Sequence, residues 1–455
     1  MDSDTSTSKM NWDLSSYFPE FNGSEMIAFK EKLKSDIDET RDNASKLEHI
    51  TVENQDKWEV IFLRYEVLFS RYTHLSSYIG CLSSADANNE QFLKEEANIT
   101  VLGADFSKLK NEMLRCLQNT DVELVNEFSG KKELSLAKHY INRLYEESKF
   151  RMSREMEALS ADLGINGISA WSRLYDTVSG KLEFEMEYPD GKKEILPISQ
   201  RRSLMENPNR DLRKAAFVCG NKAWEEIGDI AASAINAISG TRLTLNNYRK
   251  IDHFLDVALF QASITKKTLE AMFEAAYSEI ELPKKILRLK ASTMERDQIA
   301  WFDLGAPLDI EQEGNLDWER AKELVSSSFS NAYPRLGEFI DDVYRKNWID
   351  WEPRMGKRPG GFCTGSLLNK ESRIFLTYNN TIGDVLTLAH EAGHAFHSFV
   401  MRDIRPFAHN YPMTLAESAS TFAEMILSEG LISDKNIKDE QKALILDMEI
   451  NHGAV

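Results

Sequence analysis

The stretch "LTLAHEAGHAFHSFV", residues 386–400, places three histidines and one glutamate in an otherwise apolar segment. If the segment is helical, His390 and His394 are one turn apart and leave the same face, with Cβ atoms about 5–6 Å apart. Glu391 is displaced around the helix, where its carboxylate can reach a water on a shared ion without coordinating the ion. This HExxH pattern is typical of a Zn²⁺ site with two histidine ligands, a third protein ligand and one open position.

Signals before this stretch predict a strand followed by a helix. Residues 373–378, RIFLTY, have the β-branched and aromatic content of a strand. Thr381 and Asp384 form a capping box, so a helix should begin there and run to about residue 402. We interpret strand 373–378 as a template on which an extended peptide can add main-chain hydrogen bonds, although an ordinary sheet strand has the same pattern.

A purely structural role is the alternative for the histidines. His390 and His394 can be hydrogen-bonded core residues, but burying two histidines and a carboxylate without a partner carries a large desolvation cost. Metal binding is therefore favoured. His397 lies seven residues beyond His390, about 10 Å along the helix axis, which is too far for both to bind one ion. The sequence leaves three roles open for His397. It can support a metal ligand from behind, face a substrate, or simply be a polar residue.

The third ligand has to come from another segment. A metzincin pattern would place a histidine at position 400, which is Val400 here. Residues 411–430 predict a second helix of about four turns, with Glu417 in its first turn and Glu424 on nearly the same face. Thr414 and Glu417 also match a capping box, so spacing leaves Glu417 open between metal ligand and helix cap. Glu424 can accept a hydrogen bond from a ligating histidine and so orient its ring, but the spacing alone does not show whether it does.

The composition describes a folded, acidic and mainly helical protein. The chain has 455 residues, 42% of them hydrophobic, and a formal net charge of −18. Nucleic-acid binding is not expected, because affinity for phosphate backbones comes largely from clustered Lys and Arg. No apolar run reaches the roughly 18 residues that a membrane span needs, and the polar N-terminus lacks the features of a signal peptide. We therefore predict a cytoplasmic protein without membrane contact, and the sequence does not indicate an oligomeric state.

The cysteine pattern agrees with a cytoplasmic location. They are far apart and include no CxxC pair, which favours reduced thiols and excludes a zinc site built from cysteines. The four cysteines are Cys81, Cys116, Cys219 and Cys363.

Two domains are predicted. Amphipathic helical patterns fill most of the first half, and "KLEFEMEYPDGKKEILP", residues 181–197, alternates as a β-hairpin near 182–196. Helical periodicity resumes afterwards. We place the boundary near residue 197, with an N-terminal helical domain over 1–197 and a metal-binding domain over 198–455.

Several segments resemble the oligoendopeptidase F branch of the M3 metallopeptidases. The resemblance rests on "HEAGHAFHS" (390–398), "AESASTFAE" (416–424), "GKRPGGFCTGS" (356–366) and "RIFLTYNNT" (373–381), and it extends to the opening "WDLSSYF", the hairpin and "WFDLGAPLD". It implies a mainly α, two-lobed fold around a deep channel, with a small β-sheet beside the zinc helix. It also implies one Zn²⁺ bound by His390, His394 and Glu417, Glu391 as the catalytic acid/base, and short peptides as substrates.

One departure from the family suggests a shortened chain. Members of the family continue past the second zinc helix into a region that lines the cleft, whereas this sequence stops at "EINHGAV", so we expect a C-terminal truncation that leaves the substrate pocket incomplete. Two alternatives to an endopeptidase stay open. One is a metallocarboxypeptidase of similar fold, and the other is a catalytically incomplete helical fragment that binds zinc.

Overall fold

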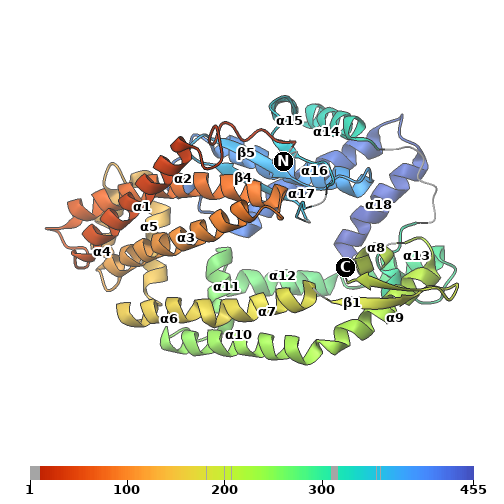
Figure 1. Cartoon of the computed structure of the whole chain (residues 1–455), viewed down its shortest axis with the longest axis horizontal. Helices are drawn as coiled ribbons and strands as arrows, with labels where there is room; N and C mark the ends of the chain where they lie inside the picture. Colours follow the sequence, from red (N-terminus) through yellow and green to blue (C-terminus); the bar gives the residue numbers. More distant parts are fainter. Residues whose placement is uncertain are drawn as a thin grey trace, which may run out of the picture. The chain divides into compact units, whose positions relative to one another are not determined.

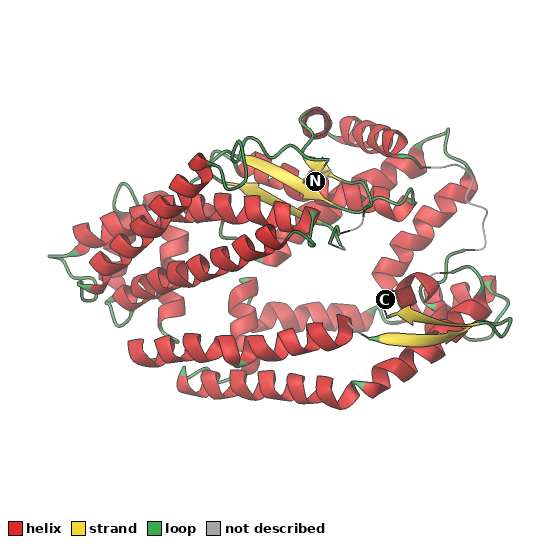
Figure 2. Cartoon of the chain, viewed as in Figure 1, coloured by secondary structure: helices red, strands yellow, loops and turns green. Residues whose placement is uncertain are grey.

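The computed structural model shows a mainly helical chain with two small sheets (Figures 1 and 2). This agrees with the fold class predicted from the sequence. Contacts divide the chain into two compact units. The first combines Met1–Arg151 with Gly314–Asp434, and the second combines Met152–Glu313 with Lys435–Val455. The structure describes residues 11–180, 182–198, 200–205, 207–308, 316–354, 356–358 and 360–454.

The first unit contains the predicted metal-binding helices. Its amphipathic helices form as predicted, because the apolar stripes become core: Met26, Leu33 and Ile37 are fully buried, as is Trp58. Its N-terminal helices are α1 (Ser24–Ser45), α2 (Gln55–Ala85), α3 (Glu90–Leu117), α4 (Val122–Gly130), the short η1 (Ser135–Ala137) and α5 (Lys138–Ser148). Its later helices are α14 (Trp318–Ala332), α15 (Pro334–Arg345), α16 (Ile382–Met401), the short η3 (Pro406–His409) and α17 (Met413–Ser433).

A three-stranded sheet lies beside α16 in this unit. Its strands are β3 (Ile349–Asp350), β4 (Phe362–Ser366) and β5 (Glu371–Phe375), in the order β3-β5-β4. The central strand β5 pairs in parallel with β3 and antiparallel with β4. The predicted strand 373–378 exists, shifted by about two residues, but its proposed role as a peptide template is wrong because it has a partner on each side. The longer edge strand is β4, which the sequence did not reveal.

Buried and partly buried polar contacts join the two segments of the first unit. The Glu66 carboxylate of α2 accepts hydrogen bonds from Arg405 Nε, at 2.8 Å, and from the N–H of Phe407, at 3.0 Å. Arg373 of β5 is 1% exposed and donates to the Asp13 carbonyl at 2.8 Å. These contacts connect the N-terminal helices to the later segment of the same compact unit, which carries the predicted metal-binding helices.

The second unit contains the predicted hairpin. Strands β1 (Glu183–Glu187) and β2 (Lys193–Pro197) pair antiparallel, and Gly191 has φ +87° in the turn, a conformation that favours glycine. The hairpin packs on α9, which follows residue 197 in the sequence, so both lie in the same compact unit. The domain boundary near residue 197 stays a prediction. The helices are α6 (Arg154–Asn166), α7 (Ile168–Gly180), α8 (Gln200–Met205), α9 (Arg210–Glu226), α10 (Gly228–Tyr248), α11 (Phe254–Ala262), α12 (Lys266–Ser278), α13 (Glu281–Thr293), the short η2 (Trp301–Asp303) and α18 (Asp439–Ala454).

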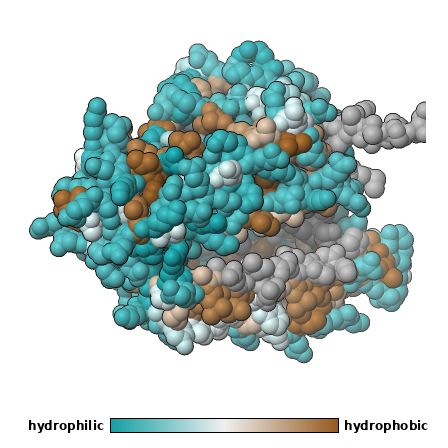
Figure 3. Space-filling model, turned by 60° about the vertical axis from the view of Figure 1, so that its left-hand side comes forward, coloured by the Kyte–Doolittle hydropathy of each residue, from teal (hydrophilic) through white to brown (hydrophobic). Residues whose placement is uncertain are grey.

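The face seen in Figure 3 is mostly hydrophilic, as expected for a chain with 28% charged residues. Among the helices that the structure describes, none combines the length and the apolar character that crossing a membrane requires.

Candidate metal centre

Helix α16 begins where the sequence predicts. The Thr381 hydroxyl accepts a hydrogen bond from the Asp384 N–H at 3.1 Å, and the Asp384 carboxylate accepts one from the Thr381 N–H at 3.0 Å. This reciprocal pair is a capping box, which fixes the first turn of the helix. The helix then places His390, Glu391 and His394 in its third and fourth turns, with the two histidines close to Glu417 of α17.

Helix α17 approaches α16 closely because Gly393 has no side chain. A Cβ atom at position 393 would lie 2.7 Å from the Ala419 carbonyl oxygen and 2.8 Å from both Ser420 Cα and Ala423 Cβ. These are contacts with the backbone and with short, rigid side chains, so only glycine permits this spacing. The close approach brings the carboxylates of α17 to the two histidines of α16.

Glu417 does not cap the helix. The N-cap of α17 is Pro412, which makes no side-chain capping bond. The helix therefore starts at Met413, one residue before Thr414, and Glu417 lies beyond the first turn. The Thr414–Glu417 capping box left open by the sequence is therefore absent. Instead, Glu417 Oε2 accepts a hydrogen bond from Ser420 Oγ at 2.9 Å and lies close to both histidines.

The two histidines and Glu417 form a three-ligand arrangement. Glu417 Oε2 lies 3.4 Å from His390 Nε2 and 3.5 Å from His394 Nε2, and the three candidate ligand atoms all lie within 4.8 Å of one another. Ligand atoms about 2.0–2.2 Å from one ion in tetrahedral geometry are about 3.3–3.6 Å apart. The two measured separations match this range, so these residues are able to hold one metal ion.

Glu424 orients His390 from behind. Its Oε1 lies 2.5 Å from His390 Nδ1, which turns Nε2 of the same ring toward Glu417. This hydrogen bond raises the pKa of His390, although burial acts in the opposite direction. At His394, burial and the neighbouring His390 lower the pKa. A carboxylate behind a ligating histidine fixes the ring orientation and tautomer, which is the role that the sequence left undecided for Glu424.

Glu391 is buried beside these candidate ligands. It is 6% exposed, and its Oε2 makes no hydrogen bond with any residue that the structure describes. Burial raises the pKa of Glu391 to about 7; His390 opposes this rise, whereas Glu417 and Glu424 add to it. A buried carboxylate oxygen without a protein partner next to three converging ligand atoms fits a site that holds a metal ion and a water molecule.

Gly361 lies directly over the Glu391 carboxylate. The sequence alone did not predict this contact. A Cβ atom at position 361 would lie 3.2 Å from Glu391 Oε1 and 3.3 Å from Thr387 Cγ2. The glycine therefore lets the chain entering β4 pass directly over the carboxylate. The Gly360-Gly361 pair gave a sequence signal for close backbone approach, but not for its partner.

Two other residues singled out from the sequence lie near the centre. His397 is not among the three converging ligands; its ring lies 4.8 Å from the Tyr411 ring, and its Nδ1 has no partner among the described residues. Cys363 lies on β4, where burial and the nearby Glu391 raise the pKa of its thiol. A raised pKa keeps the thiol protonated at neutral pH.

Gly393→Ala is expected to destabilise the protein by about 1–3 kcal/mol, because the added methyl group has to push α17 away from α16. Urea denaturation measures this free energy of unfolding. Gly240→Ala is a matched control, since this glycine also lies inside a helix, α10, but its Cβ would meet nothing within 4 Å. The control should be neutral or up to about 1 kcal/mol more stable. Equal losses in both variants would contradict the packing role of Gly393.

Comparison with known proteins identifies the family to which this helical fold and HExxH centre belong. The model of "Peptidase family M3" matches residues 203–454, and the model of "Oligopeptidase F" matches residues 117–184. The chain belongs to peptidase family M3.

Relatives of the oligoendopeptidase F type resemble most of the chain. It is 24% identical to oligopeptidase PepF of Bacillus subtilis over 424 residues, which cover 90% of this chain and 61% of that protein. It is 25% identical to an oligoendopeptidase F homolog of Lactococcus lactis, with 96% of this chain and 72% of the relative covered. The chain thus spans about three-fifths of the length of the Bacillus relative.

Solved structures share the fold. The crystal structure of oligoendopeptidase-F from Enterococcus faecium matches with a TM-score of 0.61 at 19% identity, over 94% of this chain and 71% of that one. PZ peptidase A with an inhibitor matches with a TM-score of 0.70 at 17% identity, over 93% of this chain and 72% of that one. At these identities the likeness concerns the fold.

Proposed function

We propose that the chain is a zinc-dependent oligoendopeptidase that hydrolyses internal bonds of short peptides. The observation that carries this proposal is the convergence of His390, His394 and Glu417 beside the buried, unpartnered Glu391 carboxylate. Family membership and the names of the relatives support peptides as substrates.

The donor set favours zinc over other metals. Two imidazole nitrogens and one carboxylate oxygen, at separations suited to tetrahedral coordination, are the ligands of catalytic zinc sites in which a fourth position is left for water. His390, His394 and Glu417 would hold the ion. When bound, it supplies a Lewis acid that makes water acidic enough to attack at neutral pH and that polarises a peptide carbonyl.

The protein residues divide the remaining work. Glu424 holds His390 in the tautomer that presents Nε2 to the ligand position. Glu391 accepts a proton from the attacking water at its free Oε2 and then donates it to the nitrogen of the departing amine. That proton is needed because an amide anion is too basic to leave. Burial by Gly361 keeps bulk water away from the carboxylate during this transfer.

The open edge of β4 is the best template for the substrate main chain. The Ile374 N–H of β5 donates to the Trp348 carbonyl on the far side of the sheet, so the Cys363–Ile374 pair is a non-hydrogen-bonded pair of the β4–β5 ladder. The N–H and C=O groups of Cys363, and of Gly365 two residues later, therefore point outward. An extended peptide can pair with them by β-augmentation.

The cytoplasm is the proposed location. All four cysteines are free in the structure, and two of them, Cys81 and Cys116, are fully buried. Unpaired thiols suit a reducing compartment.

An assay with blocked peptides tests the proposed function against its alternatives. A quenched fluorescent peptide with blocked N- and C-termini should be cleaved, because the site as proposed needs no terminal charge. A metallocarboxypeptidase would cleave only the matching peptide with a free C-terminus. Chelation should stop cleavage, and added zinc should restore it. Bound zinc without cleavage of either peptide would favour the non-catalytic alternative.

A further inference from the structure

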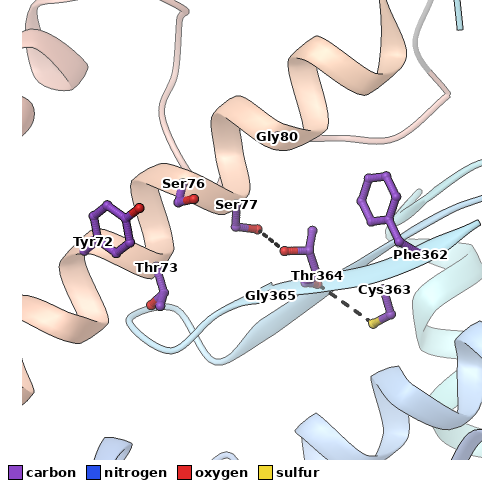
Figure 4. Close-up of a pocket in the computed structure, with 9 residues that line it drawn as sticks. All are labelled: Tyr72, Thr73, Ser76, Ser77, Gly80, Phe362, Cys363, Thr364 and Gly365. Atoms are coloured by element: carbon purple, nitrogen blue, oxygen red, sulfur yellow. Dashed lines mark hydrogen bonds between the residues drawn. The ribbon is translucent and has the colours of Figure 1, made fainter. Parts of the chain in front are cut away.

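A groove of about 420 Å³ lies between α2 and the edge strand β4 within the first unit. None of the lining residues is a ligand of the candidate metal centre. Figure 4 shows α2 on one side and β4 on the other, with Ser77 of α2 directed toward Thr364 of β4. The lining residues are Tyr72, Thr73, Ser76, Ser77, Gly80, Phe362, Cys363, Thr364 and Gly365.

Helix α2 contributes a row of hydroxyl groups to this groove. Tyr72, Thr73 and Ser76 are partly accessible, whereas their neighbours on the same helix are buried in the core. The Thr73 hydroxyl donates to a carbonyl of the preceding turn at 3.0 Å, so its oxygen keeps lone pairs for a donor in the groove. Gly80 leaves space one turn further on, because a Cβ there would meet nothing within 4 Å.

The Tyr72 hydroxyl is held in place by α3. Its ring stacks on Phe106 with centroids 5.4 Å apart and an interplanar angle of 9°. A Cβ atom at Gly103 would lie only 2.4 Å from the Tyr72 hydroxyl oxygen, so glycine at 103 is what permits this position. A hydroxyl fixed before binding loses little entropy when it makes a hydrogen bond, which improves selectivity.

Strand β4 aligns a bound peptide with this row. The Thr364 hydroxyl donates to Ser77 Oγ at 3.1 Å, which fixes the strand against the helix. Side chains alternate between the two faces of a sheet, and Thr364 points to the face that α2 covers. A peptide paired with the outward main-chain groups of Cys363 and Gly365 would therefore direct every second side chain toward the α2 hydroxyls.

We propose that the row Tyr72, Thr73 and Ser76 is a specificity-determining pocket for an uncharged, hydrogen-bonding side chain of the peptide, such as an amide. The inference rests on the proposed function. None of the nine lining residues carries a charged side chain, so an ammonium or carboxylate would be desolvated without a counter-ion. An aliphatic side chain would exclude water from these hydroxyl oxygens without offering them a hydrogen-bond donor.

Peptide binding tests this pocket without requiring turnover. The probes are dye-labelled, doubly blocked alanine peptides that carry Gln, Leu, Glu or Lys at one position at a time, and fluorescence anisotropy gives Kd on the full chain carrying Glu391→Gln. At one position, Gln should bind about tenfold more tightly than Leu, Glu or Lys. Adding Thr73→Val with Ser76→Ala should abolish the Gln preference at that position and leave the other positions unchanged.

Two further variants make the test independent of folding defects. Gly80→Leu should weaken binding of the same Gln peptide, because its side chain starts in open space that lines the groove: a Cβ at position 80 meets nothing within 4 Å. Ser107→Ala on α3 is the control, since Ser107 is exposed, its hydroxyl donates to the Gly103 carbonyl, and it is not among the residues that line the groove. An unchanged Gln preference in both groove variants overturns the inference even if peptides are cleaved. Selective binding without cleavage by the wild-type chain would support the pocket and overturn the proposed function instead.

Discussion

Glu391→Gln is expected to lower kcat/KM for a blocked peptide by about 10²–10⁴-fold while the chain keeps about one zinc ion. The amide has nearly the same shape as the carboxylate but cannot accept the proton of the attacking water. Glu391 is not among the three converging ligand atoms, so metal binding should persist. Turnover of a quenched fluorescent peptide and metal content by atomic spectroscopy are measured on the same preparation.

The control for this variant is Glu429→Gln, an exposed glutamate on α17 that lies outside the site. It should leave both readouts at the wild-type level. Turnover equal to wild type in Glu391→Gln would exclude Glu391 as the base. Loss of zinc in Glu391→Gln would mean that the carboxylate belongs to the ligand set rather than to the proton transfer.

Glu417→Ala and Glu424→Gln are expected to weaken zinc binding to different extents. Glu417→Ala removes one of the three proposed protein ligands, so the zinc affinity of this variant should fall by more than about 100-fold, and its activity should fall with it. Glu424→Gln only alters the hydrogen bond behind His390, so its affinity should fall by about 10–100-fold. Competition with a chromophoric chelator measures both affinities.

The order of the two losses is the informative result. A larger loss in Glu424→Gln than in Glu417→Ala would reverse the assigned roles of these two carboxylates. Glu429→Ala serves as the comparison, because it removes a carboxylate from the same helix at an exposed position.

Most of the site could be predicted because its signals are local. The capping box at Thr381 set the start of α16, and helical spacing placed His390 and His394 on one face without knowledge of the rest of the fold. Glu417 and Glu424 were found on the next helix, but spacing could not distinguish a ligand from a cap. That distinction depends on where the helix begins, and Pro412 begins it earlier than the capping-box pattern indicated.

The features that escaped prediction depend on contacts between distant residues. Whether β5 is central or at an edge is decided by its pairing with β3, and no local pattern in a two-residue strand reveals that pairing. The composition of the two units also depends on distant contacts. For example, Glu66 and Arg405 of the first unit form a hydrogen bond although 339 positions separate them in the sequence. The contact of Gly361 with Glu391 likewise joins separate elements.

The two-segment composition of the first unit has a consequence for biosynthesis. The ribosome makes the helices that end near Arg151 long before it makes the metal-binding segment from Gly314 to Asp434, and the whole intervening part of the second unit emerges between them. Until then, the surfaces of the early helices that contact Arg373 and Arg405 in the folded unit stay exposed, and exposed surface of this kind raises the risk of aggregation in a nascent chain. Metal acquisition is accordingly a late event, completed only when α17 has left the exit tunnel.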